Sequence, residues 1–287
     1  MKVVITGAGG MLGQALQKQL SEKYEIIALS REKLDITNYS AVKECLTAYR
    51  PEVVINAAAF TNVDGCESEQ DTAFLVNAVG PRNLAIVCNE MNASLVQVST
   101  DYVFDGKGTQ PYGEFDKTGP VSVYGKSKLA GEELVKTLMN KYFIVRTAWL
   151  FGEGGHNFVR TIFRLAAERD YLTIVDDQLG VPTYTQDLAW AIGQLISTNY
   201  FGIYHITNSD ACSWYEFAKE ILEQAGISNT AVKPIKSDEL NRPAPRPSFS
   251  VLDNRVWRLA GFQELRSYKE ALKGYLNNLK HLGEGGV

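Results

Sequence analysis

Tyr124 and Lys128, four positions apart, carry the side chains in this sequence that are most suited to chemistry. On a helix, residues at this spacing share one face, with Cβ atoms about 5–6 Å apart. A phenol keeps its proton up to about pH 10, but a neighbouring ammonium favours the phenolate and makes the phenol a better acid near neutral pH. The hydroxyl of Thr100 could orient a carbonyl oxygen toward that phenol. We therefore predict that Thr100, Tyr124 and Lys128 are catalytic and protonate a carbonyl while a cofactor delivers hydride.

The spacing alone is weak support, since it also occurs after Tyr39 and after Tyr215. Most such matches belong to ordinary helix surface. Tyr124 differs because the apolar run Leu95–Val98 ends just before Thr100, as a strand would at the catalytic edge of a sheet. A nucleotide-binding signature also opens the chain, and the other two tyrosines have no comparable partner upstream.

The nucleotide-binding signature lies between a predicted strand and a predicted helix. Val3–Thr6 is short, β-branched and apolar, as a buried parallel strand should be, and helical periodicity begins at Met11. Between them, glycines at positions 7, 10 and 13 would permit a tight turn and let a pyrophosphate approach the helix N-terminus. In this context, dinucleotide binding is favoured over an ordinary glycine-rich turn.

The end of the second predicted strand, Tyr24–Leu29, bears on the choice of cofactor. Ser30 and Arg31 follow it, without the acid that would hold the ribose 2′-hydroxyl of NAD. Arg31 could instead pair with the 2′-phosphate of NADP, or it could be a solvated surface arginine. Asp35 could contact adenine or cap the helix that begins near Asn38. NADPH is thus favoured and NADH stays possible.

Small side chains follow the third predicted strand, Val53–Asn56, and would let the backbone pack against a flat ligand. Asn77, within the helix predicted from residue 71 to 89, could be a structural hydrogen-bonding residue or a brace for the active site. The predicted cofactor-binding residues are Gly7, Gly10, Met11, Leu12, Gly13, Ser30, Arg31, Asp35, Ile36, Ala57, Ala58, Ala59, Thr61, Val98, Tyr124 and Lys128.

Five alternations of strand and helix before residue 150 predict an α/β fold with a Rossmann-type, doubly wound parallel sheet. Beyond residue 150 the pattern changes. We expect a dinucleotide-binding domain over residues 1–150, with a returning segment near 184–207. Residues 151–183 and 208–287 would form a smaller C-terminal α/β substrate-binding domain.

Ligands of such sheets bind at the carboxyl ends of the strands. Gly7, Ala59, Thr100 and Trp149 all follow predicted strand ends. Trp149 could form a flat apolar wall for a sugar, or it could be a core tryptophan. In the proline-rich segment near the C-terminus, Arg246 could meet a diphosphate, although a rigid surface linker is the alternative.

Composition narrows the function classes. The 287 residues can bury a substantial core, and a net charge of −4 with interspersed acids and bases argues against a nucleic-acid partner. No apolar run approaches the roughly 20 residues that span a bilayer, and no signal peptide is apparent. The scattered cysteines and the three histidines show no metal-binding spacing, so we expect a cytoplasmic protein with reduced thiols and no metal site.

Several motifs together resemble the extended short-chain dehydrogenase/reductase superfamily and, within it, the dTDP-4-dehydrorhamnose reductase family. These motifs are Gly7–Gly13, Asn56–Asp64, Ser99–Gly106, Val123–Glu132, Arg146–Trp149, Gly155–Phe158 and Asp177–Thr183. They span most of the chain, and the Ser-Thr-Asp-Tyr-Val-Phe string is specific to this branch.

The resemblance implies reduction of the 4-keto group of dTDP-4-dehydro-β-L-rhamnose by NADPH or NADH, giving dTDP-L-rhamnose for polysaccharide synthesis. Thr100 would orient the carbonyl, Tyr124 would be the acid, and Lys128 would hold the nicotinamide ribose. The predicted substrate-binding residues are Thr100, Asp101, Tyr102, Trp149 and Arg246. Some members bind Mg²⁺ at a dimer interface through acidic residues that find no match here, so Mg²⁺ and a homodimer are possible without being predicted.

Two other functions stay open. A nucleotide-sugar epimerase or dehydratase would use the same fold and the same Tyr/Lys pair, but it would recycle its cofactor. A relative of this branch is a non-catalytic regulatory subunit of a methionine adenosyltransferase. The intact set of Thr100, Tyr124 and Lys128 argues against that role, because a regulatory subunit does not need it.

Overall fold

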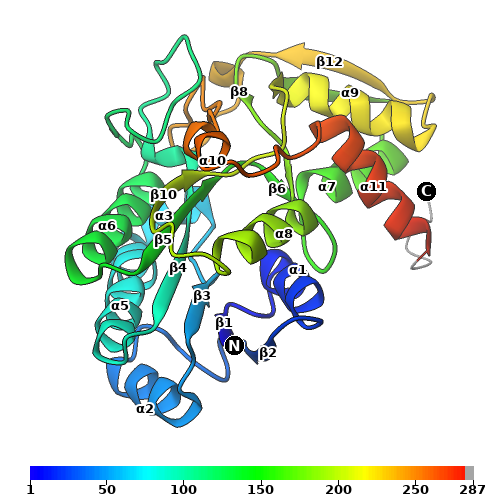
Figure 1. Cartoon of the computed structure of the whole chain (residues 1–287). Coiled ribbons are helices and arrows are strands. Elements are labelled where there is room, and N and C mark those ends of the chain that lie inside the picture. The colour runs from blue at the N-terminus through cyan, green and yellow to red at the C-terminus, as the bar shows by residue number, and fades with distance from the viewer. Residues whose placement is uncertain (282–287) are drawn as a thin grey trace.

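The computed structural model describes residues 1–281, and its centre is a six-stranded parallel sheet (Figure 1). The strand order is β10-β5-β4-β3-β1-β2, which confirms the predicted doubly wound, Rossmann-type fold. The strands are β1 (Lys2–Thr6), β2 (Glu25–Leu29), β3 (Val53–Asn56), β4 (Ser94–Thr100), β5 (Tyr142–Thr147) and β10 (Gly202–His205).

Helices cover both faces of this sheet. One face carries α1 (Met11–Leu20), α8 (Thr185–Leu195) and α10 (Arg255–Leu259); the other carries α2 (Tyr39–Tyr49), α5 (Gly80–Glu90) and α6 (Val123–Leu138). Successive strand residues point to opposite faces. Accordingly, Ile5 and Val145 belong to the core under α1 and α8, whereas Val4 and Ile144 belong to the core under α2 and α5. Burial on both faces explains why these strands are continuous apolar runs.

The connections at the carboxyl edge are less regular. The crossover after β3 contains α3 (Val63–Ser68), α4 (Gln70–Phe74) and a π-helical turn η1 (Leu75–Val79), which leads into α5. The single helix predicted from residue 71 to 89 is therefore observed as three consecutive pieces. A short 3-10 turn, η2 (Asp101–Val103), follows β4. Single π-helical turns are frequent at functional sites, and this one contains Asn77.

A second, smaller core lies beyond β5. Its elements are β6 (Leu150–Phe151), α7 (Phe158–Glu168), β7 (Tyr171–Val175), β8 (Leu179–Gly180), β9 (Thr183–Tyr184), β11 (Cys212–Ser213), α9 (Trp214–Ala225), β12 (Ala231–Ile235), η3 (Ser237–Glu239) and α11 (Tyr268–His281). The strands form only pairs, β6 with β9, β7 with β12 and β8 with β11. Phe151, Phe217 and Tyr275 are fully buried among them.

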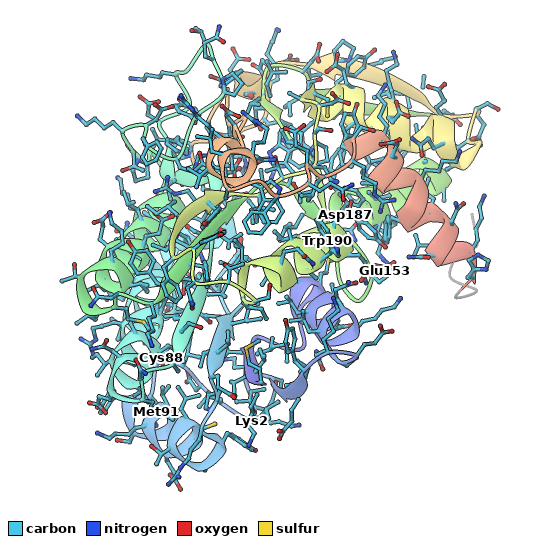
Figure 2. The ribbon with its side chains drawn as sticks, in the orientation of Figure 1. Lys2, Cys88, Met91, Glu153, Asp187 and Trp190 are labelled. Carbon is cyan, nitrogen blue, oxygen red and sulfur yellow. The ribbon has the colours of Figure 1, made fainter. Side chains whose placement is uncertain are left out.

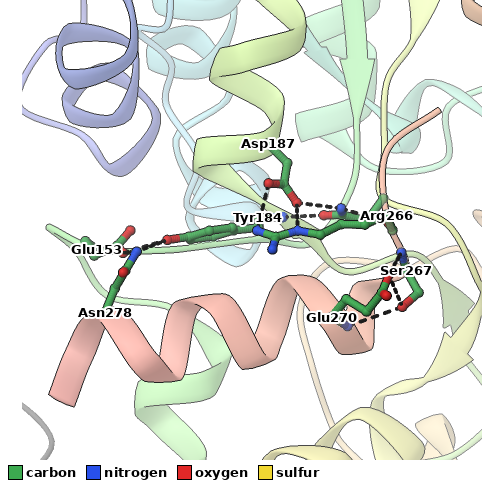
Figure 3. A network of polar contacts seen from close by, with 8 residues as sticks. Glu153, Tyr184, Asp187, Arg266, Ser267, Glu270 and Asn278 are labelled. Atoms are coloured by element: carbon green, nitrogen blue, oxygen red, sulfur yellow. Dashed lines mark hydrogen bonds and ion pairs between the residues drawn. The ribbon is translucent and has the colours of Figure 1, made fainter. Parts of the chain in front are cut away.

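The segment near 184–207 returns to the first core, where α8 packs against α1 and β10 pairs with β5. Polar contacts join α8 to the approach of α11 (Figure 3). Asp187 accepts hydrogen bonds from the Arg266 guanidinium (2.9 Å) and from Asn208 (2.8 Å). Figure 2 labels Asp187 and Trp190 near the centre of the view with Glu153 close by, whereas Cys88 is labelled toward the lower left. The division into two domains stays a prediction.

The end of α11 is tied to the loop after β6 by a second set of contacts. Glu153 accepts hydrogen bonds from the Tyr184 hydroxyl (2.6 Å) and from Asn278 (3.1 Å) (Figure 3). Within residues 1–281, no helix is both long enough and apolar enough to cross a membrane.

Candidate active site

The three predicted catalytic residues lie on two elements that meet at the carboxyl edge of the sheet. Thr100 is the last residue of β4, and Tyr124 and Lys128 lie in the first turns of α6. Ser122 caps this helix by accepting a hydrogen bond from the backbone N–H of Gly125 (3.1 Å). A Cβ at Gly125 would clash with a backbone carbonyl of η2. Glycine at this position therefore lets the start of α6 approach the loop that follows β4.

The Thr100 hydroxyl and the Tyr124 phenol lie beside each other. Thr100 Oγ1 donates a hydrogen bond to Asp101 Oδ1 (2.9 Å) and accepts one from the backbone N–H of Tyr102 (3.2 Å). The Tyr124 ring packs edge-on against the Tyr102 ring, with centroids 5.6 Å apart. Burial raises the pKa of Tyr124 well above its usual range; a hydrogen bond with Thr100 lowers this pKa and the charge of Asp101 raises it.

This direction corrects the expectation that the phenol would be a better acid near neutral pH. The sequence spacing identifies a neighbouring ammonium, but it does not reveal the desolvation around the ring, which is the largest influence on the pKa of Tyr124. The Lys128 ammonium donates instead to the carbonyl oxygen of Val98, at 2.6 Å. Tyr124 therefore holds its proton firmly across the neutral range, and it would release the proton only to a strongly basic oxygen such as an alkoxide.

Lys128 and Asp101 are two buried ionisable groups near the phenol. Burial lowers the pKa of Lys128 to about 8, while the charge of Glu132 raises it. Burial raises the pKa of Asp101 to about 6, against hydrogen bonds from Ser250 and Thr100 that lower it. Buried groups with shifted pKa values that gather at one strand end are typical of an active site.

A cavity of about 530 Å³ lies at the same sheet edge, around the turn after β1. Of the predicted cofactor-binding residues, it is lined by Gly7, Gly10, Met11, Leu12, Gly13, Arg31, Asp35, Ile36, Ala57, Ala58, Ala59 and Thr61. Ser30, Val98, Tyr124 and Lys128 do not line it. Six further residues line the cavity without having been predicted from the sequence: Leu34, Phe60, Glu69, Thr72, Val76 and Leu150. Leu34 and Phe60 are direct sequence neighbours of predicted residues, so they could have been predicted as well. Glu69, Thr72 and Val76 lie in the crossover after β3 and Leu150 lies in β6, and only the folded chain places these four residues at the cavity.

The glycine turn has the shape that a dinucleotide needs. Gly7 adopts a positive φ of 67°, and a Cβ there would lie 2.5 Å from the backbone nitrogen of Ala58. A Cβ at Gly13 would clash with the carbonyl oxygen of Gly7. The turn therefore packs its backbone directly against the backbone of Ala58, and the glycines, which have no side chains, line the cavity. These residues fit a bound pyrophosphate at the N-terminus of α1.

Arg31 and Asp35, which follow β2, both contribute to the cavity wall. Asp35 accepts hydrogen bonds from the backbone N–H (2.9 Å) and hydroxyl (2.8 Å) of Thr37. Asn38, not Asp35, caps α2 by accepting from the N–H of Ala41 (3.1 Å). Asp35 is thus free of the capping role, and its carboxylate borders the site predicted for adenosine.

Trp149 is held in an unusual backbone conformation just beyond the end of β5. It is two residues beyond Thr147, which pairs with Thr100 in the sheet. Its φ is 47°, in the left-handed region that a bulky residue rarely adopts. Its indole stacks on Trp214, with centroids 3.5 Å apart, and a Cβ at Gly180 would clash with it. Strain of this kind is concentrated at functional sites.

Arg246 does not present a free guanidinium for a diphosphate. It forms a two-point ion pair with Asp64, with Nη1–Oδ1 and Nη2–Oδ2 distances of 3.0 and 2.9 Å. The same carboxylate accepts from the backbone N–H of Ala244 (3.2 Å), and Arg242 approaches it at 3.5 Å. Both arginines nevertheless act on the pKa of Tyr102. Sequence spacing could not reveal this ion pair, because Asp64 is distant in the sequence. Binding of the substrate by Arg246 stays a prediction.

Asn77 braces the loop after β3. Its side chain accepts from the backbone N–H of Phe60 (2.8 Å) and donates to the carbonyl of Phe60 (3.0 Å) and to Ser127 Oγ (3.0 Å). It thereby connects the cavity wall to α6. Residues 1–281 contain no group of three or more His, Cys, Asp or Glu side chains that could hold a metal ion.

Similarity to known proteins agrees with this arrangement. The family described as RmlD substrate binding domain matches residues 1–281. The spore coat polysaccharide biosynthesis protein SpsK of Bacillus subtilis is 46% identical over 96% of this chain and 96% of its own.

Two solved structures are similar over nearly their whole length. The crystal structure of a dTDP-4-dehydrorhamnose reductase from Clostridium acetobutylicum is 47% identical, with a TM-score of 0.96, and the match covers 98% of this chain and 100% of that one. That of a dTDP-4-dehydrorhamnose reductase from Bacillus anthracis, in complex with NADP, is 44% identical, with a TM-score of 0.95 and coverage of 97% and 100%. The chain therefore belongs to the RmlD substrate binding domain family, which confirms the resemblance inferred from its motifs.

Proposed function

We propose that this protein reduces the 4-keto group of dTDP-4-dehydro-β-L-rhamnose with NADPH and releases dTDP-L-rhamnose for polysaccharide synthesis. The proposal is carried by the meeting of Thr100, Tyr124 and Lys128 at one strand end, on the sheet edge that also holds the glycine-lined cavity. The names of the two solved reductases support the substrate, and the NADP complex of one of them supports the cofactor.

The division of labour in this reaction follows from the side chains. NADPH, when bound, supplies the hydride for C4 of the sugar. Tyr124 supplies the proton for O4: burial holds the phenol protonated, and the oxygen becomes basic enough to take the proton as negative charge develops on it. Thr100 can redirect its hydroxyl from Asp101 to donate a second hydrogen bond to that oxygen. Removing one such donor typically slows a reaction by about 10²–10³-fold.

Lys128 and Trp149 place the reactants. Below about pH 8, Lys128 is an ammonium at the carboxyl end of β4 and can donate to a ribose hydroxyl. Trp149, stacked on Trp214, offers a fixed apolar surface for one face of the sugar. In the cavity, Arg31 can pair with a 2′-phosphate, which is the reason to propose NADPH over NADH.

The test is an assay of NADPH and NADH oxidation with dTDP-4-dehydro-β-L-rhamnose, alongside other nucleotide keto sugars. We expect stoichiometric oxidation that is fastest with the dTDP sugar and with NADPH. Turnover of a nucleotide sugar without net oxidation of the cofactor would support an epimerase or dehydratase instead. Absence of any turnover, with copurification of a partner enzyme, would favour the regulatory-subunit alternative. Light scattering on the purified protein would distinguish a monomer from a homodimer.

A further inference from the structure

Glu132 continues the four-residue spacing of Tyr124 and Lys128 along α6, although the proposed mechanism does not use it. Its carboxylate accepts a hydrogen bond from Ser99 Oγ (2.5 Å) and forms a two-point ion pair with Arg146, with distances of 3.0 Å to Nε and 2.7 Å to Nη2. The side chains of Glu132 and Arg146 are 0% and 3% exposed. Few ion pairs are so fully removed from water, because desolvation costs several kcal/mol per ion.

The three residues on this face of α6 contact three consecutive residues at the end of β4. Tyr124 contacts Thr100, Lys128 donates to the carbonyl of Val98, and Glu132 accepts from Ser99. Arg146 is the partner of Ser99 in the pairing of β4 with β5. The ion pair therefore joins α6 to both strands directly behind the catalytic side chains.

The surroundings of Arg146 make Glu132 its counter-ion. Its Nη1 lies 3.4 Å from His205 Nε2, and burial lowers the pKa of His205 to about 3, so this imidazole is neutral near pH 7. The guanidinium carbon lies 5.3 Å from the centroid of the Phe104 ring. A buried pair of this kind is weak support for stability, since replacement by apolar residues is often neutral. Its position beside the catalytic residues suggests a different use.

We propose that the Glu132–Arg146 ion pair is a positioning device, which fixes α6 on β4 and β5 and holds a carboxylate one helical turn from Lys128. The proposal rests on the proposed function. Glu132 is a positioning residue because it acts through Lys128 and touches neither substrate nor cofactor.

The ionisable groups on and around this face of α6 act on different pKa values. Besides Lys128, these groups are Cys66, Asp101, Tyr102, Tyr124, Glu132 and Arg146. Asp101, Tyr102 and Cys66 act on the pKa of Tyr124, whereas the charge that acts on the pKa of Lys128 is that of Glu132. The pKa of Asp101 is about 6 and that of Lys128 about 8, so loss of the Lys128 charge should govern the alkaline side of a pH profile.

The experiment compares Glu132→Gln with Glu133→Gln, a matched control on the same helix. Glu133 pairs with Lys136 at 3.0 Å, but its side chain is 56% exposed. Two profiles are recorded from pH 6 to 10: kcat with the keto sugar, and the NADPH dissociation constant by fluorescence. In the wild type, we expect kcat and NADPH affinity to fall above about pH 8, and we call this pH the alkaline break. In Glu132→Gln, the break should move down by about one pH unit, which is the size of effect that one partly screened charge a helical turn away exerts. Glu133→Gln should keep the wild-type break.

Two further variants keep the test valid if Glu132→Gln does not fold, because that substitution leaves the buried Arg146 guanidinium without its carboxylate partner. Glu132→Leu/Arg146→Met removes both charges and should fold, yet it should also show the lowered break. Glu132→Asp should restore the break near pH 8, with kcat lowered by the shorter side chain. An unmoved break in the folded double variant, in both profiles, would overturn the proposal. NADPH binding needs no keto sugar, so failure of the proposed activity would be seen separately as absence of turnover by the wild-type protein.

Discussion

The proposed cofactor side and the proposed substrate side of the strand ends are built in different ways. The cofactor cavity is lined by short runs that directly follow β1, β2 and β3, such as Gly7–Gly13 and Ala57–Thr61. On the proposed substrate side, two of the candidate residues are fixed by partners from distant parts of the chain. Trp149 stacks on Trp214, and Arg246 pairs with Asp64 across 182 positions of sequence. Local sequence therefore specifies the first side, and tertiary contacts specify the second.

The largest expected effect is the loss of proton donation, which should slow the reaction without changing the binding of the cofactor. In Tyr124→Phe, the proton donor is lost while the ring remains, so we expect kcat to fall by about 10³-fold. NADPH affinity should be unchanged, because the phenol does not line the cavity. Steady-state kinetics and a fluorescence titration of NADPH measure the two quantities. A kcat close to that of the wild type would exclude Tyr124 as the acid.

The next effect tests the cofactor side through its backbone packing. An alanine at Gly13 would clash with the carbonyl oxygen of Gly7, whereas a Cβ at Gly9 would meet nothing within 4 Å. We expect Gly13→Ala to cost about 1–3 kcal/mol of unfolding free energy and to weaken NADPH binding at least tenfold. Gly9→Ala should change stability by less than about 0.5 kcal/mol. Thermal unfolding with and without NADPH gives both values, and equal behaviour of the two variants would contradict the close-packed turn.

These two sides also differ in what the sequence alone could predict. The glycine spacing between a strand and a helix has a local physical cause, and the residues predicted from it, between Gly7 and Gly13, line the cavity. The Tyr124–Lys128 spacing predicted a shared helix face. It gave the wrong direction for the pKa of Tyr124, because burial depends on how α6 packs against β4 and η2. Likewise, no local sequence pattern reveals that Arg246 forms an ion pair with Asp64.

A smaller effect tests cofactor choice at the end of the cavity. Arg31→Gln removes a guanidinium that lines the cavity and should lower NADPH affinity by about tenfold, the cost of a lost charge-assisted hydrogen bond. NADH affinity should stay the same, since NADH has no 2′-phosphate. Parallel titrations with the two cofactors measure the ratio. An equal loss for both would mean that Arg31 supports the cavity wall without reading the phosphate.

The smallest effect tests the substrate side. Trp214→Leu removes the ring on which Trp149 stacks, an interaction worth about 0.5–1.5 kcal/mol. We expect the KM for the keto sugar to rise about three- to tenfold while the NADPH dissociation constant is unchanged. Initial rates at varied sugar concentration give the answer. If NADPH binding weakened and the KM did not move, Trp149 would belong to the cofactor side.

The central claim, that the residues meeting at the end of β4 carry out a net carbonyl reduction, is tested most directly by following a labelled hydride. The wild-type protein would be incubated with dTDP-4-dehydro-β-L-rhamnose and NADPH deuterated at the transferable position of its nicotinamide ring. We expect one deuterium at C4 of the product sugar for each nicotinamide oxidised. A product without deuterium, or a cofactor that ends the reaction still reduced, would contradict the account.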